Sequence, residues 1–402
     1  MIDVTFLIAA HNRREVLLNT LRQLRRCGLP PESYETILVD NASTDGTADA
    51  VAAAFPEVVL LREKLNRGAC VKNAGLPIAR GRFVVFLDDD SYPLAGSVAR
   101  MIRHFEADPL LGAAVFDVQL PDGSRECSAY PNVFIGCGTG FRRRALAQVG
   151  GLPEDFFMQA EEYDLSLRLL AAGWVVRRFD DLHVAHLKTP TARKSTRTTR
   201  LDVRNNLTLI GRYFPDRWVM PFALDWANRY AMLAAARGHR LAHWQGMAEA
   251  AIRAVRGIDR RPLTDEAFES FARIDAIRHR LRAARDAFGF QRILLADLGK
   301  NVLAYWMAAE ACGLEVIAVA DDTLGGRGWT YRDLPIVSND EARRTPFDAV
   351  VISNMSPVHA ALRRTCWRRA RREPVIDFFE TTLTSAVPPG SSESRRTVAR
   401  SA

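Results

Sequence analysis

The chain has 402 residues, which is too long for a single ordinary hydrophobic core, so we expect roughly two or three domains. With 48% hydrophobic and 25% charged residues, its composition excludes an intrinsically disordered protein and is typical of a globular one. The formal net charge of +8 favours acidic partners such as phosphates, nucleotides, anionic lipid or nucleic acid.

The N-terminus and the cysteines indicate a cytoplasmic protein. The first residues have no basic start and read at once as a strand, so we expect no signal peptide. No stretch has the roughly 18 unbroken apolar residues of a membrane span, because Asp225, Asn228 and Arg229 interrupt the best candidate. The cysteines are scattered without a C-x-x-C pair, which is typical of reduced thiols. They are Cys27, Cys70, Cys127, Cys137, Cys312 and Cys366.

The first ninety or so residues alternate between strand and helix patterns. Strands are predicted at 4–10, 35–40, 58–63 and 82–90, and helices at 14–28, 43–55 and 67–81. Such alternation predicts βαβ units and a mainly parallel sheet, hence the α/β fold class. In open parallel sheets, ligands bind beyond the carboxyl ends of the strands. Asp40, the segment 9–13 and the triplet Asp88, Asp89 and Asp90 all lie at such ends.

The rest of the chain changes character twice. From about Ser195 to Asp286 the patterns are helical and rich in arginine, and strands return at 292–297, 315–322 and 348–353. The predicted regions are an α/β domain at 1–215, an arginine-rich helical segment at 216–288, a second and smaller α/β domain at 289–380, and a disordered tail at 381–402.

Three adjacent carboxylates at a strand end repel one another. Asp88, Asp89 and Asp90 would lower that repulsion by sharing a divalent cation, and Mg²⁺ or Mn²⁺ prefers such oxygen ligands. The alternative is a solvated turn after a strand, since aspartate is common in turns.

A second acidic group opens an amphipathic helix. Glu161, Glu162 and Asp164 follow an apolar, loop-like stretch and precede the leucines of that helix. Acids at a helix N-terminus are favoured by the helix dipole alone, by about 0.3–1 kcal/mol each. A carboxylate in a partly apolar cleft is instead suited to act as a general base with a raised pKa.

Five segments follow one another in a specific order. They are LIAAHNRREVLLNTLRQL, ILVDNASTDGT, NRGACVKNAGLPIARGRFVVFLDDD, GTGFRRRALAQVGGLPEDFF and EEYDLSLRL. This order resembles the family 2 glycosyltransferases over residues 3 to about 215. The resemblance implies a GT-A fold, a nucleotide-sugar donor and an inverting reaction.

The resemblance also implies roles for residues at the strand ends. The aspartate triplet matches the DXD element of the family, with Asp88 and Asp89 facing the nucleotide. Asp90 would be the chief ligand of Mn²⁺ or Mg²⁺, and Asp88 a further one. Asp40 matches the acid that reads a pyrimidine base. The other donor-binding positions implied are Ala10, His11, Arg13 and Arg67.

For the general base, the resemblance points to the helix acids. Glu162 occupies the base position, although the family commonly has aspartate there, so Glu161 and Asp164 remain alternatives. After that helix, a predicted strand ends with His183 and His186. Some relatives have a metal-binding histidine here, and His186 matches that position better.

The C-terminal α/β domain resembles Rossmann-type nucleotide-binding domains, but its fingerprint is degenerate. Of the glycines expected over 297–302, only Gly299 is present; Val302 replaces the packing glycine, and Asp297 would repel a pyrophosphate. Asp321 could meet a ribose, but a structural, oligomerising or regulatory module is the favoured reading. Six arginines at 362–373 are either a phosphate or partner site or a solvated face.

The arginine-rich middle leaves two readings open. In the first, its aromatic residues lie on anionic lipid or bind a polyprenyl-diphosphate acceptor. In the second, they form an ordinary core beneath a solvated arginine face. These residues are Tyr213, Trp218, Phe222, Trp226 and Tyr230.

Taken together, the sequence predicts a metal-dependent inverting glycosyltransferase. The expected donor is a UDP-sugar first and dTDP-rhamnose second, and the acceptor a hydroxyl of a glycan or lipid-linked saccharide. A peripheral membrane contact and a homo-oligomer stay open, and no nucleic-acid partner is expected. The alternatives are a non-catalytic sugar-nucleotide scaffold and a bifunctional enzyme that also uses the C-terminal domain. A sugar nucleotidyltransferase is disfavoured because no glycine-rich loop follows the first strand.

Overall fold

The computed structural model describes residues 2–188 and 195–380, so the tail predicted at 381–402 lies outside the described residues. The chain divides into two compact units. Unit 1 comprises Met1–Tyr213 and Gln245–Ala267, and unit 2 comprises Phe214–Trp244 and Phe268–Ala402. The predicted helical segment 216–288 is therefore shared between the two units.

Unit 1 contains the first nine strands. They are β1 (Val4–Ala10), β2 (Tyr34–Asn41), β3 (Val59–Glu63), β4 (Phe83–Asp88), β5 (Ser91–Pro93), β6 (Leu111–Gln119), β7 (Arg125–Glu126), β8 (Thr139–Arg142) and β9 (Val175–His186). Its helices are α1 (Arg14–Leu24), η1 (Pro31–Ser33), α2 (Thr47–Ala54), η2 (Gly68–Ile78), α3 (Ser97–Ala107), α4 (Arg143–Val149), α5 (Glu161–Ala171) and α6 (Thr196–Tyr213).

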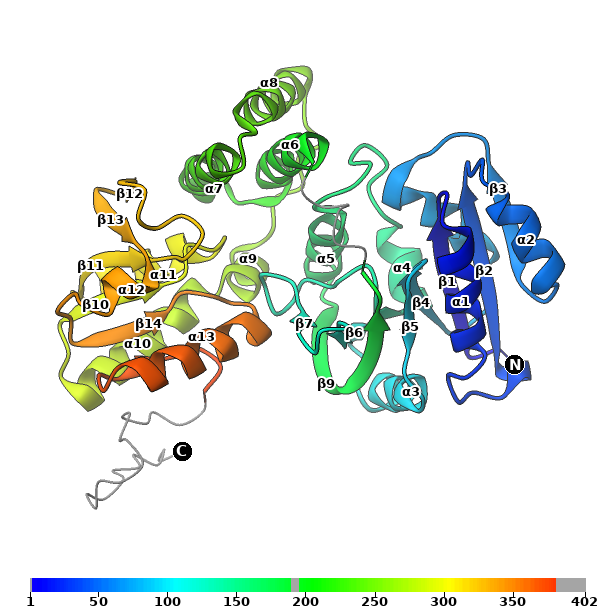
Figure 1. The fold of residues 1–402 in the computed structure, drawn as a ribbon, viewed down its shortest axis with the longest axis horizontal. Helices are drawn as coiled ribbons and strands as arrows, with labels where there is room; N and C mark the ends of the chain where they lie inside the picture. The colour runs from blue at the N-terminus through cyan, green and yellow to red at the C-terminus, as the bar shows by residue number, and fades with distance from the viewer. Residues whose placement is uncertain (1, 189–194, 381–402) are drawn as a thin grey trace, which may run out of the picture. The chain divides into compact units, whose positions relative to one another are not determined.

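These strands form one mixed sheet in the order β3-β2-β1-β4-β8-β6-β9-β5, with β7 paired to β6 (Figure 1). Strands β3, β2, β1 and β4 run parallel, as the alternating pattern predicts. In that register Ala10 lies beside Asp40, and Ala9 lies beside Asp88. The carboxyl ends that carry the predicted polar residues therefore share one edge of the sheet.

Apolar side chains cover both faces of this sheet. Phe6 and Ile8 of β1 pack on one face with residues of α1 and α3, and Leu7 packs on the other with residues of η2, α4 and α5. Because successive strand residues point to opposite faces, two-sided burial explains why β1 and β4 read as nearly unbroken apolar runs.

One predicted element has a different form. The helix expected at 67–81 is the 3₁₀ helix η2, which contains Pro77. Proline lacks the backbone N–H that an α-helix interior needs, so a regular α-helix does not continue through this segment.

Unit 2 carries a second α/β sheet in the order β12-β13-β11-β10-β14-β15. Its strands are β10 (Arg292–Ala296), β11 (Glu315–Ala320), β12 (Thr330–Tyr331), β13 (Leu334–Val337), β14 (Ala349–Ile352) and β15 (Val375–Ile376). The helices after α6 are α7 (Asp216–Ala236), α8 (Arg240–Arg256), α9 (Asp265–Ala272), α10 (Ile274–Phe288), α11 (Val302–Ala311), α12 (Asn339–Ala342) and α13 (Pro357–Ala370). Helices α8 and α9 cross the division between the units. The predicted α/β fold class is confirmed.

The aromatic residues of α7 are core residues. Phe222 and Trp226 are buried and contact Phe214 and Phe268 of the same unit edge to face. Of the two readings of the arginine-rich middle, the aromatic core is therefore the correct one for these side chains. Within the described residues, no helix combines the length and hydropathy that a bilayer crossing requires.

Candidate active site

A cleft of about 580 Å³ opens in unit 1 beyond the carboxyl ends of β1 and β4. The predicted site residues that line it are Ala10, His11, Arg13, Asp88, Asp89, Asp90, Glu161, Glu162 and His186. They come from segments far apart in the sequence, namely the strand ends, the start of α5 and the end of β9. The cleft thus brings the aspartate triplet together with the helix acids.

The charges of the aspartate triplet are offset by two cations. Arg13 lies 2.7 Å from Asp90 and 3.6 Å from Asp89, and the Lys72 ammonium lies 3.1 Å from Oδ1 of Asp88. Burial, with the charges of Asp90 and Asp88, still raises the pKa of Asp89 to about 7, although Arg13 opposes the shift. Asp89 therefore holds its proton more tightly than a solvent-exposed aspartate does.

His186 lies at the end of β9, and β9 pairs with β5. Because β5 begins directly after the aspartate triplet, this pairing brings His186 to the triplet. Ser91 is the register partner of His186. The Nε2 atom of His186 lies 3.2 Å from Asp90, and Nδ1 lies 2.6 Å from Glu126. Burial by itself would lower the pKa of His186, but contacts with Asp90, Cys137 and Glu126 outweigh burial and raise it to about 12.

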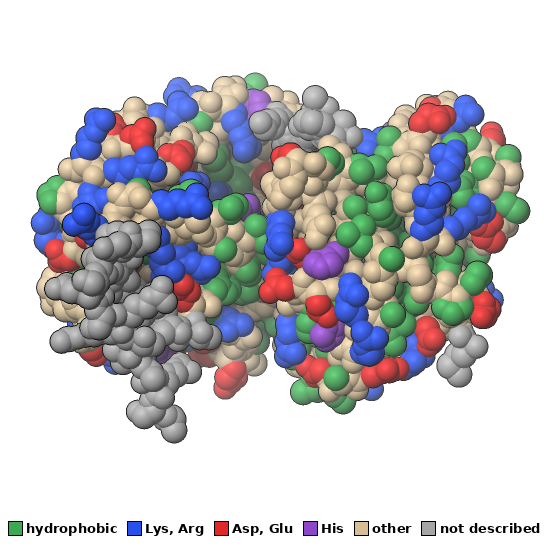
Figure 2. All heavy atoms as spheres, turned by 60° about the horizontal axis from the view of Figure 1, so that its bottom comes forward, with side chains coloured by type: hydrophobic (Ala, Val, Ile, Leu, Met, Phe, Trp, Pro, Cys, Tyr) green, Lys and Arg blue, Asp and Glu red, His purple; other side chains and the backbone are tan. Residues whose placement is uncertain are grey.

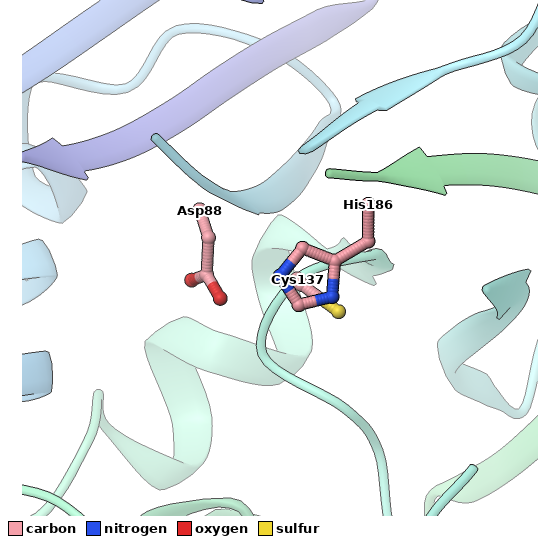
Figure 3. Close-up of side chains that lie close together, drawn as sticks. All are labelled: Asp88, Cys137 and His186. Atoms are coloured by element: carbon pink, nitrogen blue, oxygen red, sulfur yellow. The ribbon is translucent and has the colours of Figure 1, made fainter. Parts of the chain in front are cut away.

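One set of side chains in the described part of the chain has the spacing of a metal site. Ligand atoms of Asp88, Cys137 and His186 all lie within 4.8 Å of one another (Figure 3). A carboxylate with an imidazole suits Mn²⁺, while the nitrogen and sulfur donors suit Mg²⁺ less well. Asp90 is not in this set; its two carboxylate oxygens contact Arg13 and Nε2 of His186. The donor set fits a divalent cation held by Asp88 and His186.

Two acids lie side by side at the start of α5. Glu161 and Glu162 both line the cleft. The Oε2 atom of Glu161 is buried and has no hydrogen-bond partner among the described residues. Burial, together with the charge of Glu162, raises the pKa of Glu161 well above its ordinary value. A carboxylate pair in a partly buried cleft suits acid–base chemistry.

Asp164 does not reach the cleft. It is buried and accepts hydrogen bonds from Arg168 at 2.8 Å, Arg212 at 2.9 Å and the Tyr213 hydroxyl at 2.8 Å. Residues two apart on a helix point about 200° away from one another, so Asp164 and Glu162 face opposite sides of α5. Asp164 is therefore part of a buried ion-pair network, and its placement argues against its use as the base.

The loop that leads into α5 has an unusual backbone. Phe157, Gln159 and Ala160 all have positive φ values, at 66°, 72° and 68°. Such conformations cost free energy in residues other than glycine, so neighbouring contacts must hold them. These residues immediately precede Glu161.

Two contacts hold this loop. The Asn205 side-chain amide, buried on α6, donates to the carbonyl oxygens of Phe156, Met158 and Gln159 at 3.1, 2.9 and 2.8 Å. On the other side, the Ala69 amide donates to the Phe157 carbonyl oxygen at 2.7 Å. A Cβ on Gly68 would lie 2.0 Å from that oxygen, so only glycine fits there.

Asp40 and Arg67 lie next to the cleft but do not line it. Asp40 is buried at the end of β2; its Oδ2 accepts from the Ser43 amide at 3.2 Å, and its Oδ1 has no partner among the described residues. The Arg67 guanidinium lies 2.9 Å from Glu154. Asn41 lines the cleft, and its side-chain oxygen accepts a hydrogen bond from the Arg67 backbone amide at 2.8 Å. This contact connects Arg67 to the wall of the cleft.

The sequence reasoning missed several residues of this site. Lys72, Cys137, Glu126 and Asn205 carry no motif that would single them out. Only the tertiary structure brings them to the aspartates, to His186 or to the loop before α5. Lys72 offered a weak signal, since it is the single lysine of the η2 segment.

In unit 2, the two carboxylates considered for nucleotide binding, Asp297 and Asp321, contact groups of the protein itself. The Asp321 carboxylate accepts from the backbone amides of Leu298, Thr323 and Leu324, so it stabilises a turn and does not face a ribose. Asp297 has a φ of 119° and accepts from Asn354 at 2.7 Å. These carboxylates serve the local structure of unit 2.

The arginines of α13 are largely paired. Arg364 contacts Asp377, Arg368 donates to both oxygens of Glu380 at 2.7 and 2.6 Å, and Arg363 lies 3.4 Å from Asp322. Figure 2 likewise shows basic and acidic side chains interspersed on the face in view. The solvated, ion-paired reading of this helix fits better than a phosphate site.

Comparison with known proteins agrees with this geometry. Residues 5–132 match the family model described as Glycosyl transferase family 2. The chain is 35% identical over 108 residues to the Succinoglycan biosynthesis protein ExoO of Rhizobium meliloti (strain 1021), covering 26% of this chain and 30% of that protein. The chain therefore contains a family 2 glycosyltransferase domain.

Two further relatives complete the comparison. One is the UDP-Glc:alpha-D-GlcNAc-diphosphoundecaprenol beta-1,3-glucosyltransferase WfaP of Escherichia coli, 27% identical over 107 residues, 26% of this chain and 42% of that protein. The other is the solved mannosyltransferase PcManGT from Pyrobaculum calidifontis in complex with GDP-Man and Mn²⁺. It aligns over 77% of this chain and 86% of its own, with 22% identity and a TM-score of 0.45. The chain spans less than half the length of the two curated relatives.

Proposed function

We propose that the protein is a metal-dependent inverting glycosyltransferase that moves a sugar from a nucleotide-sugar donor to a hydroxyl of a glycan or glycolipid acceptor. One observation carries this proposal. A single cleft is lined both by the aspartates at the end of β4 and by Glu161 and Glu162 at the start of α5. Charge neutralisation at a diphosphate and deprotonation of an acceptor need these two groups close together.

The donor occupies the side of the cleft formed by β1 and β2. Ala10, at the end of β1, lines it there together with His11 and Arg13, and Arg67 lies beyond Asn41. The unpartnered Oδ1 of Asp40 is a buried acceptor that suits the imide N–H of uracil or thymine. This supports a pyrimidine nucleotide, with a UDP-sugar first and dTDP-rhamnose second.

Asp88 and His186 are the residues that would hold a divalent cation, with Mn²⁺ favoured over Mg²⁺. Such a cation, when bound, supplies positive charge that offsets the charge of the diphosphate. Asp89 and Arg13 border the same position and orient the phosphates. Asp90 contacts Arg13 and His186 beside this position, and its part as the chief ligand stays the proposal that the family resemblance implies.

Glu162 is the proposed general base. It takes the proton of the acceptor hydroxyl, and the resulting oxygen attacks the anomeric carbon of the sugar. The bond from that carbon to the nucleotide diphosphate breaks, and its electron pair leaves with the diphosphate. Attack from the opposite face inverts the anomeric configuration. Glu161 lines the same cleft beside Glu162 and is the alternative base.

The nature of the acceptor draws on the relatives. ExoO is named for succinoglycan biosynthesis, and WfaP for transfer of glucose onto a diphosphoundecaprenol-linked sugar. These names support a growing or lipid-linked bacterial-type saccharide as the acceptor of this chain.

The donor is tested by thermal-shift screening of UDP-, dTDP- and GDP-sugars, each with Mn²⁺ and with a chelator. The proposal expects stabilisation by a pyrimidine nucleotide sugar that is reduced by the chelator. Selective stabilisation by a GDP-sugar would contradict the pyrimidine assignment. Stabilisation that the chelator leaves intact would contradict the proposed role of a metal in donor binding.

A non-catalytic scaffold is the alternative that binds the same ligands without chemistry. Release of nucleoside diphosphate from the stabilising donor, by transfer or by slow hydrolysis, distinguishes the two. The bifunctional alternative has less support, because the Asp321 carboxylate in unit 2 is occupied by three backbone amides.

A further inference from the structure

Helix α8 carries an apolar stripe that the described structure leaves uncovered. Leu241, Trp244, Ile252 and Val255 expose 72%, 67%, 49% and 88% of their surface. The exposed alanines Ala248 and Ala251 lie between them. The positions 241, 244, 248, 251 and 255 are spaced by three and four residues, so they share one face of the helix. Exposed large side chains normally occur singly, so a stripe of this length calls for a partner.

The opposite face of α8 attaches the helix to unit 1. A Cβ on Gly246 would lie 2.5 Å from the Arg200 carbonyl oxygen and 2.8 Å from Cβ of Val203, both on α6. Ala250, one turn further on, is buried as well. The positions of Trp244 and Ala248 lie about 200° around the helix from Gly246. The stripe therefore lies on the side of α8 that faces away from α6.

The charges around the stripe select the kind of partner. The exposed charged residues of α8 are Arg240 and Arg256, one near each end. The only acid of the helix, Glu249, is half-buried and lies 3.6 Å from both Arg200 and Arg204 of α6. Pairing α8 with a second copy of itself would set arginine against arginine in either orientation. An anionic surface complements both ends at once.

We infer that α8 lies in the interface of a lipid bilayer with anionic headgroups, with Leu241, Trp244 and Val255 at the boundary of headgroups and acyl chains. An amphipathic helix with a tryptophan-containing apolar face and basic flanks has the features of such an element. The inference does not depend on the proposed transferase activity, since it concerns binding to lipid alone.

The test is co-sedimentation of the full chain with vesicles of phosphatidylcholine, with and without phosphatidylglycerol. The wild-type protein is expected to bind the anionic vesicles and to release them at high salt. The triple variant Leu241→Gln, Trp244→Gln, Val255→Gln is expected to lose about tenfold or more of this binding. Because all three side chains are exposed, the variant should fold, which its thermal denaturation checks.

Two controls separate the stripe and its charges from general surface effects. Leu362→Gln removes an apolar side chain that is 58% exposed on α13, and should leave vesicle binding unchanged. The pair Arg240→Glu, Arg256→Glu should weaken binding to anionic vesicles severalfold. The wild type is expected to show a blue shift of tryptophan fluorescence with these vesicles, and Trp244→Phe should keep binding but lose that shift.

Three results would overturn the inference. The first is a wild-type protein that does not sediment with anionic vesicles. The second is a triple variant that sediments as the wild type does. The third is a wild-type dimer in light scattering that the triple variant abolishes, because the stripe would then bind a second copy of the chain.

Discussion

The Lys72 ammonium lies 3.1 Å from Oδ1 of Asp88, so a buried cation contacts the first aspartate of the triplet. The ammonium nitrogen also lies over the Phe86 ring, 5.6 Å from the ring centre. A lysine held in this way neutralises part of the charge at the strand end before any ligand arrives.

Replacing this lysine should impair donor handling more than folding. Lys72→Met keeps the apolar stem but leaves Asp88 facing Asp89 and Asp90 without its cation. We expect kcat/KM for the donor to fall by about 10- to 100-fold. Lys64→Met, at an exposed position, is the matched control. Equal activity of both variants would show that Lys72 has no electrostatic part in the site.

The loop before α5 gives a second prediction. Asn205→Ala removes all three hydrogen bonds to the carbonyl oxygens of Phe156, Met158 and Gln159. The start of α5 should then be less well positioned, lowering kcat with little change in the donor KM. Stability should fall by about 1–3 kcal/mol. Asn228→Ala, at an exposed position on α7, serves as the control. A rise in donor KM at constant kcat would contradict a positioning role for Asn205.

Asp164 should matter for stability. Asp164→Asn leaves Arg168 and Arg212 without the carboxylate that they share with Tyr213. Breaking a buried ion pair in this way costs about 3–5 kcal/mol, so chemical denaturation should show a large loss. Protein that remains folded should retain most of its transfer activity per molecule. A variant of normal stability and abolished activity would instead place Asp164 in the chemistry.

Asp225 in unit 2 predicts a pH effect. It is buried, its Oδ1 accepts from the Tyr331 hydroxyl at 2.6 Å, and its Oδ2 has no partner among the described residues. Burial raises the pKa of Asp225 from 3.8 to about 6. The folded state therefore holds the proton more tightly than the unfolded state, and stability from this group falls as pH rises from about 4 to 6.

The variant Asp225→Asn mimics the neutral acid and removes this dependence. Its melting temperature should match the wild type near pH 4 and exceed it above pH 6, by an amount equivalent to at most about 3 kcal/mol. Asp333→Asn, at an exposed position, should show no such trend. A difference between Asp225→Asn and wild type that stays constant across this pH range would contradict the raised pKa.

Some parts of the fold and site were predictable and others were not, for physical reasons. Apolar runs ending in Asp40 and Asp88 predicted the parallel strands and the shared edge, because strand pattern and polarity are local signals. Glu161 and Glu162 were found because they begin a helix. Asp164 was predicted as an alternative base because it is close to Glu162 in the sequence. Its position two residues after Glu162 already places it on the other face of that helix.

The remaining residues depend on contacts that no local pattern encodes. Lys72 and Asn205 reach the site from η2 and α6, and Cys137 meets His186 only because β8 and β9 lie in one sheet. From the sequence, the aromatic residues of α7 were compatible with a lipid-facing surface and with a core, and the core was the favoured interpretation. Their burial follows from packing against Phe214 and Phe268, whereas the exposed stripe on α8 was not singled out at all.

The central claim is that Glu162 is the base of a transferase whose donor sits at the aspartates. The most direct measurement compares sugar transfer by the wild type, Glu162→Gln and Asp164→Asn, with donor binding of each followed by thermal shift. We predict that Glu162→Gln binds the donor as the wild type does and loses transfer by about 100-fold or more, while folded Asp164→Asn still transfers. Near-normal transfer by Glu162→Gln would contradict the account.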